Sequence, residues 1–515
     1  MRRTRRALAA IAVPATALAL VLAGCSGQTS TAGGSSAGGS AGGSATDTLT
    51  LGMTADINGW DPSAQPPYQA WGIEAVYDQL VQCDTSGGII PEAAESWEIS
   101  PDNTSFTAHL RPGQKFSDGT PVDAAAVQAS FEPLIKSASD RYGGITFASP
   151  DANTITITWP EPQPLMNNRV CSPQIASAKY LASGDLNTAP VGSGPYVFNA
   201  ANSTSGSIYS FDKNPSYWGA DKYPYEHLEL RVLADETASL NALKTGQIDG
   251  TLITPALYDQ AKSAGMSTLQ TAVGIIQFQL TDRAGEKIPA LGNLKVRQAM
   301  NMVLDEQAIS DQLFQGHAKP VHQIFGETSQ AYIKDLGDPY PYDVDKAKQL
   351  MQESGFGDGF TLTVPTMEGQ PWLPILPYVT QQLGLLNIKV EQKALTGPDA
   401  INQLISGDYP APLWGLGGSS DSIQDISIQV LDTGFWNVSH QPDATIDALW
   451  QKIVTGNQDE KVAAQQEINK YVTENAWFVP IVAPFGFYAY SNAVSVPQMS
   501  DPNGGHPLLR DFQKN

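Results

Sequence analysis

The chain has 515 residues, which is too long for one ordinary hydrophobic core, so we expect two or more domains. Hydrophobic residues make up 41% of it, which indicates a globular protein and excludes a disordered one. The 52 acidic and 30 basic residues give a formal net charge of −22, which makes nucleic acid and anionic lipid poor partners and favours a soluble body outside the cell.

The N-terminal segment 1–24 has the features of an export signal. Arginines at the start precede an apolar stretch, 7–21, which is interrupted by Pro14 and too short for a permanent membrane span. The sequence LAGC that ends at Cys25 resembles a bacterial lipoprotein processing site, which implies cleavage before Cys25 and lipidation of its thiol. An ordinary secretory signal with a chance cysteine is the alternative. Because TRRAL at 4–8 weakly resembles a twin-arginine signal, the export route stays open.

After Cys25, residues 26–46 are nearly all Gly, Ser, Ala and Thr. A segment of that composition cannot build a core, so it predicts a flexible tether over 25–46. No later apolar run is long enough to span a bilayer. We therefore expect the body to be anchored by lipid to the outer face of the cell membrane, and not embedded in it.

The most distinctive stretch runs from residue 92 to residue 134. Apolar and polar side chains alternate over 106–111, which predicts a half-buried strand. Asp123 stands where it can cap a helix, because apolar residues follow it at helical spacing. By itself this pattern predicts an α+β unit.

The sequence of that stretch, with AESW at 94–97 and LRPGQKFSDGTP at 110–121, closely resembles the signature of the family 5 extracytoplasmic solute-binding proteins. These are the peptide- and nickel-type receptors of ABC importers. Further blocks, such as APVGSGPYVF at 189–198 and FDKNPSYWG at 211–219, extend the resemblance over about residues 47–500. It implies an α/β to α+β, two-lobed fold of the type II periplasmic-binding-protein (Venus-flytrap) kind, with an extra subdomain inserted in the first lobe.

The resemblance also implies where the parts of the chain begin and end. They are an export signal at 1–24, the lipidated cysteine and tether at 25–46, lobe I at 47–75, 187–275 and 491–515, the inserted subdomain at 76–186, and lobe II at 276–490.

Several elements of these parts are predicted from local pattern. The chain is expected to cross into lobe II along an alternating strand at 274–280. One amphipathic helix is expected from Lys295 past Ile309 towards Gly316. Another is expected to be capped by Asp343 and ended by Gly355. The glycines at 192 and 194 invite a nucleotide-loop interpretation, but no Lys follows and no helix opens there, so a tight turn is predicted.

Besides Cys25 the chain has two cysteines, Cys83 and Cys171. In an exported chain a pair is more often bridged than free, so we expect a disulfide between them. A metal site is not expected, because no His or second Cys lies at ligand spacing near either one.

The segment 412–441 is where the resemblance places the ligand, and where this chain departs most from the family. Peptide-binding relatives carry an Asp here that pairs with the ammonium group of the peptide, and Asp421 is its best positional match. A carboxylate in a closed cleft of low dielectric favours a cationic ligand group. An exposed loop position is the alternative for Asp421. Asn437 is the counterpart of a polar residue that contacts the ligand backbone.

Four aromatic residues are further ligand-binding candidates. Trp414 and Trp436 lie in the same segment and could form apolar walls, although ordinary core positions are the alternative. Trp60 lies in a loop that resembles a cleft-bordering loop of the family, and Tyr490 lies in the strand that returns to lobe I. Packing of an exposed loop is the alternative for Trp60.

Catalytic motifs are absent from the sequence. It contains no HExxH, no P-loop and no GxSxG nucleophile elbow, since GxSxG occurs only within the Gly- and Ser-rich tether. His317 and His322 are five residues apart, which does not place both on one helical face, so surface or capping positions are expected. We predict no catalytic residue, metal or cofactor. The alternatives to a receptor are an exported glycosidase with paired carboxylates and an anchored surface protein without a small ligand.

We therefore expect a lipid-anchored solute receptor of an ABC importer, in the periplasmic space if an outer membrane is present. It would enclose its ligand between lobes that close about a hinge, and then dock on permease subunits. A peptide is the leading ligand, and a sugar, an opine or a nickel complex is the alternative. The expected partners are this ligand, the permease and, through Cys25, the membrane, but no nucleic acid. The receptor is expected to be a monomer.

Overall fold

The computed structural model describes residues 47–63, 70–85, 87–183, 186, 189–233, 235–272, 274–367, 370, 372–397, 399–417, 421–501 and 505–515. The expected export signal, Cys25 and the tether lie outside the described residues, so they stay predictions. Among the helices that are described, none is long and apolar enough to cross a membrane.

Ten strands form the central sheet, in the order β10-β11-β12-β1-β13-β20-β15-β19, with β14 and β16 also paired to β20. β1 runs parallel to β12 and β13, and the remaining pairs are antiparallel. The strands are β1 (Thr48–Met53), β10 (Tyr196–Phe198), β11 (Ile208–Lys213), β12 (His227–Val232), β13 (Gly250–Ile253), β14 (Ser267–Ala272), β15 (Ile275–Gln279), β16 (Ala318–Pro320), β19 (Leu413–Leu416) and β20 (Phe478–Tyr490).

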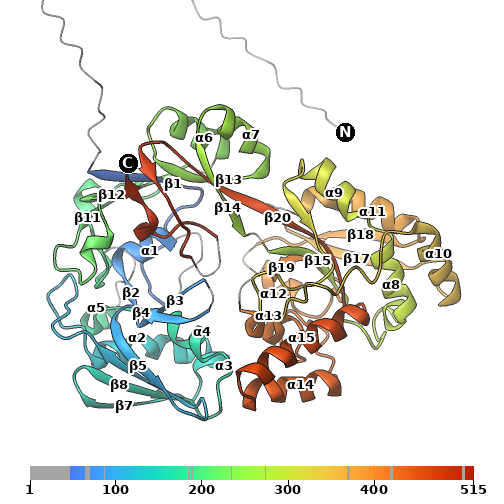
Figure 1. Ribbon diagram of the computed structural model, residues 1–515, viewed down its shortest axis with the longest axis horizontal. Helices are drawn as coiled ribbons and strands as arrows, with labels where there is room; N and C mark the ends of the chain where they lie inside the picture. The colour runs from blue at the N-terminus through green and yellow to red at the C-terminus, as the bar shows by residue number, and fades with distance from the viewer. Residues whose placement is uncertain are drawn as a thin grey trace, which may run out of the picture. The chain divides into compact units, whose positions relative to one another are not determined.

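Strand β20 passes from one half of the body into the other (Figure 1). Its residues 485–490 pair with β13 and β14, whereas its residues 478–484 pair with β15 and β16. The predicted crossing strand at 274–280 is β15, which lies directly beside β20. Residues 485–490, expected in lobe II, are thus paired with strands of the expected lobe I.

The core of the first half is rich in Tyr and Trp side chains packed around β1, β11 and β12. The glycine-rich turn presses against the backbone of α1 (Ala70–Val76). A Cβ at Gly192 would stand 1.8 Å from the carbonyl oxygen of Val76, and the N–H of Gly194 donates to that oxygen at 3.0 Å. The glycines are therefore needed for close backbone approach and do not form a phosphate loop. Two more helices, α6 (Glu236–Lys244) and α7 (Pro255–Ser263), and the short pair β21 (Val494–Ser495) and β22 (Gln513–Lys514) complete this half.

Residues 80–175 contain a separate hydrophobic core. Its antiparallel sheet has the order β5-β6-β8-β7, and the predicted strand is β6, in which every second side chain is buried. Asp123 caps α2, as predicted, by accepting from Ala126 N at 2.9 Å. The elements are β2 (Asp78–Gln79), β3 (Val81–Cys83), β4 (Ile89–Pro91), β5 (Ala94–Ile99), β6 (Ser105–Leu110), α2 (Ala124–Ser137), α3 (Ser139–Tyr142), β7 (Thr146–Asp151), β8 (Thr154–Thr158), α4 (Met166–Cys171), β9 (Gln174–Ile175) and α5 (Ala178–Ser183).

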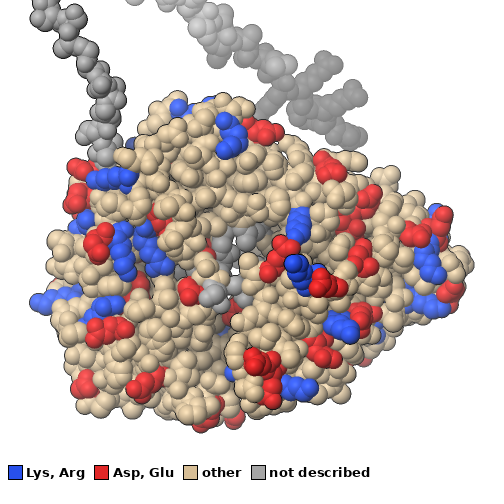
Figure 2. Space-filling view, in the orientation of Figure 1, with Lys and Arg blue, Asp and Glu red and all other residues tan. Residues whose placement is uncertain are grey.

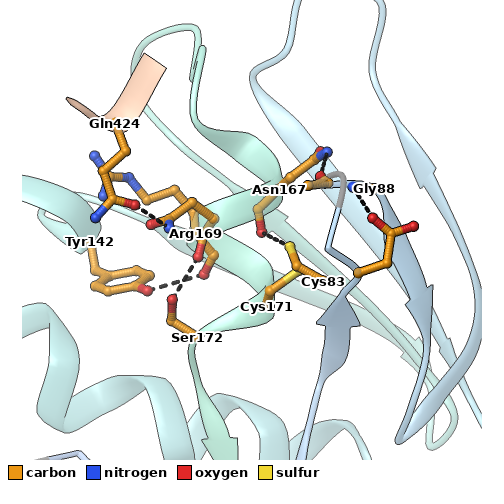
Figure 3. Close-up of a disulfide and its surroundings, with 11 residues drawn as sticks. Cys83, Gly88, Tyr142, Asn167, Arg169, Cys171, Ser172 and Gln424 are labelled. Atoms are coloured by element: carbon orange, nitrogen blue, oxygen red, sulfur yellow. Dashed lines mark hydrogen bonds between the residues drawn. A yellow bond between two sulfur atoms is a disulfide. The ribbon is translucent and has the colours of Figure 1, made fainter. Parts of the chain in front are cut away.

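A disulfide joins Cys83, at the end of β3, to Cys171, at the end of α4, with the two Cα atoms 5.5 Å apart (Figure 3). It ties the short helix α4 to the β3–β4 pair, so the helix is fixed at its last residue.

Two buried carboxyls, Asp78 and Glu92, are hydrogen-bonded to each other beside Tyr217, whose hydroxyl donates to Asp78 Oδ1 at 3.0 Å. Burial raises the pKa of both carboxyls, and repulsion from Glu92 raises the pKa of Asp78 further. A carboxyl whose pKa is higher in the folded state stabilises the fold below its unfolded pKa, and that stabilisation is lost as pH rises through the folded pKa.

We therefore expect the Glu92→Gln variant, which cannot ionise at this position, to gain stability relative to the parent chain as pH rises from 5 to 8. Thermal unfolding of both chains across this range measures the difference between them, which cancels other titrating groups such as His506. If the stability difference between the two chains does not change with pH, the carboxyls of Asp78 and Glu92 ionise as readily in the folded chain as in the unfolded one.

The second half carries the remaining elements and two hydrophobic cores, one around β15 with α8, α10 and α11 and one around α13, α14 and α15 (Figure 1). Its elements, besides β15, β16 and β19, are α8 (Leu294–Met302), α9 (Glu306–Leu313), α10 (Val344–Glu353), β17 (Thr361–Thr366), α11 (Leu376–Gly384), β18 (Lys389–Ala394), α12 (Ala400–Leu404), α13 (Ser422–Gln429), α14 (Ala444–Thr455) and α15 (Gln458–Glu474).

Of the two helices predicted in this half, one is confirmed and the other is not. Asp343 caps α10 by accepting from Lys346 N at 2.8 Å, and Gly355 follows that helix with φ of 82°. The single helix predicted from Lys295 towards Gly316 is wrong. The first helix, α8, ends at Met302. A second helix, α9, then begins with Asp305 as its N-cap, because the Asp305 carboxylate accepts from Ala308 N at 2.8 Å.

Candidate ligand-binding site

The segment that the sequence analysis singles out follows β19, which lies at the end of the central sheet beside β15 and places Trp414 opposite Gln277. After β19 the chain enters α13 at Asp421 and leaves it towards Trp436 and Asn437. Residues 418–420 lie outside the described part of the chain. Figure 2 shows the surface hollowed near the middle of this face, where acidic and basic side chains are interspersed.

Three tryptophans pack together in this region. The ring centroids of Trp414 and Trp436 are 5.2 Å apart, and those of Trp372 and Trp414 are 4.5 Å apart. Each side chain is between 6% and 9% exposed, so the cluster belongs to the core of this half and retains a small accessible edge. Trp372 was missed by the sequence analysis, because nothing local in the sequence links it to residues 414 and 436.

Asp421 is the N-cap of α13. Its Oδ1 accepts from Ile423 N at 3.1 Å and from Gln424 N at 3.2 Å. Burial raises the pKa of its carboxyl above the ordinary value, while these bonds and the charge on Arg169 lower it. The side chain is therefore neither an exposed loop Asp nor a carboxylate reserved for a ligand, because it also holds the start of a helix.

Asn437 closes the other end of the same helix. It is fully buried and donates from Nδ2 to the carbonyls of Val430 at 3.2 Å and Leu431 at 3.0 Å. Its Oδ1 is buried and has no hydrogen-bond partner among the described residues. The amide therefore orders the turn after α13 and still carries an unused acceptor.

The structure places Trp60 and Tyr490 away from this group, in the core of the first half. Trp60 is 2% exposed and packs against Phe198 at 5.0 Å between ring centroids. Tyr490 pairs through its backbone with Gly250 and lies over Tyr488. Trp60 is therefore a core residue and not part of an exposed loop. Trp414 packs against Trp436, and Asp421 and Asn437 lie at the two ends of α13.

His317, for which a surface or capping position is expected, is half-buried. Its ring lies half-buried between Tyr258 and Phe487, at 4.6 and 5.2 Å between centroids, and its carbonyl accepts from Phe485 N at 2.9 Å. Phe487 belongs to β20, so the rings of Tyr258 and His317 pack against this strand close to where it crosses between the halves. Across the described residues, no group of three or more His, Cys, Asp or Glu side chains could hold a metal ion.

Comparison with known proteins defines the class. Residues 88–437 match the sequence profile described as bacterial extracellular solute-binding proteins, family 5 Middle. The Di/tripeptide-binding protein 1 of Pseudomonas aeruginosa is 27% identical over 390 residues, which cover 67% of this chain and 71% of that protein. The Heme-binding protein A of Haemophilus influenzae is 27% identical over 529 residues, covering 93% of this chain and 94% of that protein.

Among solved structures, that of DppA from Helicobacter pylori with the peptide STSA superposes with a TM-score of 0.73 at 23% identity, covering 90% of this chain and 97% of that one. The chain belongs to family 5 of the bacterial extracellular solute-binding proteins. The predicted two-lobed fold is thereby confirmed. The protein is an extracytoplasmic solute receptor of an ABC importer and not an enzyme.

Proposed function

We propose that this receptor captures a peptide with a free amino group between its lobes and delivers it to a membrane permease. The observation that carries the proposal is Asp421. Burial raises the pKa of its carboxyl, so a cationic group of the ligand beside it would further stabilise the ionised form. Trp414 and Trp436, which belong to the same segment, would supply an apolar wall, and the naming of the P. aeruginosa relative for di- and tripeptides supports a peptide.

A thermal-shift panel tests this proposal. A shortened chain that begins at Ser26 is mixed with di- to pentapeptides, and separately with oligosaccharides, opines and nickel chelates. A ligand at a hundred times its dissociation constant stabilises the folded state by about 2.7 kcal/mol, which raises the melting temperature. A rise with peptides alone supports the proposal, and a rise with another class alone overturns it.

Replacement of Asp421 by Asn is expected to weaken the binding of a peptide more than tenfold with little change in melting temperature. Asn caps a helix about as well as Asp, so the variant removes the charge and keeps the start of α13. Isothermal titration with the peptide found in the panel measures the change. Asp343→Asn, which makes the same change at the cap of α10, is the matched control and should bind normally. Unchanged affinity in Asp421→Asn would remove Asp421 from the site.

The cluster of three indoles favours a second candidate, a sugar or another solute with a ring that packs against them. For such a solute the wall and not the carboxylate would contribute most of the affinity. In the same panel a rise in melting temperature with oligosaccharides, opines or nickel chelates alone would identify this case. Trp436→Ala would then weaken binding more than Asp421→Asn does.

We also propose that a lipid on Cys25 holds the receptor at the outer face of the cell membrane. The support is the LAGC sequence and the Gly- and Ser-rich segment that follows it. In cells that carry the full chain, Cys25→Ala should release the receptor into the soluble extracytoplasmic fraction. If the variant stays with the membranes as the parent chain does, the anchor is not at Cys25.

A further inference from the structure

Helices α4 and α13 meet although they belong to different hydrophobic cores. Buried residues of α4, such as Val170, lie in the core of residues 80–175, whereas Ile426 of α13 packs with α14 and α15. Between the helices, Asn168 Nδ2 donates to Gln424 Oε1 at 2.6 Å, across 256 residues of sequence. Figure 3 shows Gln424 reaching from its own segment towards α4. The hydrogen bond therefore joins the two halves of the receptor directly.

Charges support the same contact. Arg169 follows Asn168 on α4, and its positive charge lowers the pKa of the Asp421 carboxyl at the first turn of α13. Opposite charges on the two halves thus favour the approach of α4 to α13. A cationic ligand group at Asp421 would share the carboxylate with Arg169.

The short helix α4 is fixed on its own side. The disulfide holds Cys171, Asn167 Nδ2 donates to the carbonyl of Gly87 at 2.8 Å, and Tyr142 Oη donates to the carbonyl of Arg169 at 3.0 Å (Figure 3). Asn167 is therefore bonded within its subdomain, whereas its neighbour Asn168 is bonded across to α13. A fixed helix loses little freedom when it makes that contact, so the contact can favour one arrangement of the lobes.

We propose that Asn168 and Arg169 on α4, with Gln424 and Asp421 on α13, form an interlobe latch that stabilises the closed arrangement of the receptor whether or not a solute is bound. Asp421 is also the proposed ligand anchor, but the hydrogen-bonded pair Asn168 and Gln424 is not, so this pair is a positioning device. One net hydrogen bond of ordinary strength changes an equilibrium by roughly 2–10-fold. The latch therefore sets how much of the ligand-free receptor is already closed, and so how much affinity the closing step costs.

The test uses small-angle X-ray scattering of the ligand-free chain that begins at Ser26, which retains every core and sheet described above. Mass spectrometry of the denatured sample first verifies that no solute has co-purified. The variants are Asn168→Ala, Gln424→Ala and the double substitution. The matched controls are Asn167→Ala, which removes an amide bonded within the subdomain, and Gln451→Ala, which removes an exposed amide from α14.

Each single variant should raise the ratio of open to closed receptor by about 2–10-fold. Because the two side chains bond to each other, the double variant should show no further increase. Both controls should scatter as the parent chain does. The proposal is overturned if Asn168→Ala and Gln424→Ala leave the scattering unchanged, if their effects add, or if Asn167→Ala opens the receptor equally. Because no solute is present, these outcomes leave the proposed peptide ligand untouched.

Discussion

The double variant Cys83→Ser/Cys171→Ser is expected to have a free energy of unfolding about 4–5 kcal/mol lower than the oxidised protein. The disulfide closes a loop with a sequence separation of 88, and in the chain-entropy account a loop of that size greatly restricts the unfolded chain. Urea denaturation of the chain that begins at Ser26 measures the loss. The midpoint should fall, and the slope should rise because the unfolded chain without the disulfide exposes more surface.

The same variant has a second readout, because the disulfide fixes α4. Freed from Cys83, α4 should present Asn168 less firmly to α13, so the open fraction in ligand-free scattering should rise together with the loss of stability. The matched control is the parent chain with its disulfide reduced, which should resemble the double variant in both measurements. A loss below about 1 kcal/mol would show that the unfolded chain is constrained by other contacts.

Arg297→Met is expected to lower the free energy of unfolding by roughly 3–5 kcal/mol, since three buried carbonyls would lose a charged donor at about 1–2 kcal/mol each. The guanidinium of Arg297 donates from Nη1 to Leu291 O at 2.9 Å, from Nη2 to Asn475 O at 3.0 Å and from Nε to Ala476 O at 3.2 Å. Asn475 and Ala476 form the turn from α15 into β20. The side chain therefore holds the start of the strand that crosses between the halves.

Chemical denaturation measures this effect, and Lys295→Met provides its control. Lys295 lies on the same helix and pairs with Glu353 at the surface, at 2.9 Å. An exposed pair of this kind contributes about 1 kcal/mol or less, so the control should stay close to the parent chain. Equal losses in the two variants would mean that the carbonyls of Asn475 and Ala476 find water or another donor when Arg297 is absent.

Asp421 has two roles in the candidate site, one proposed from its position in the sequence and one observed in the structure. Asp421 is indicated by its place in a segment, and the same segment holds Trp414 and Trp436, whose rings pack together. Its second role, as the N-cap of α13, depends only on neighbouring residues, because an Asp directly before a helix is a common N-cap. The first role stays a proposal until a ligand is identified.

Movement of the lobes must be accommodated at the crossing. Here β20 changes partners between residues 484 and 485, and the rings of Tyr258, His317 and Phe487 pack around it at 4.3 to 5.2 Å between centroids. Closure by a hinge would leave these contacts as the pivot while α4 and α13 approach or separate. The crossing and the latch are thus two places where described contacts connect the halves.

The sequence by itself determined the family, the class of fold and most of the local elements, including the strand that became β6 and the caps at Asp123 and Asp343. Periodicity and capping act between neighbours in the chain, so they can be read from it. The split between α8 and α9, the burial of Trp60 and the joining of Asn168 to Gln424 were decided only by the tertiary structure. These depend on packing and on partners up to 256 residues apart, for which no local pattern exists.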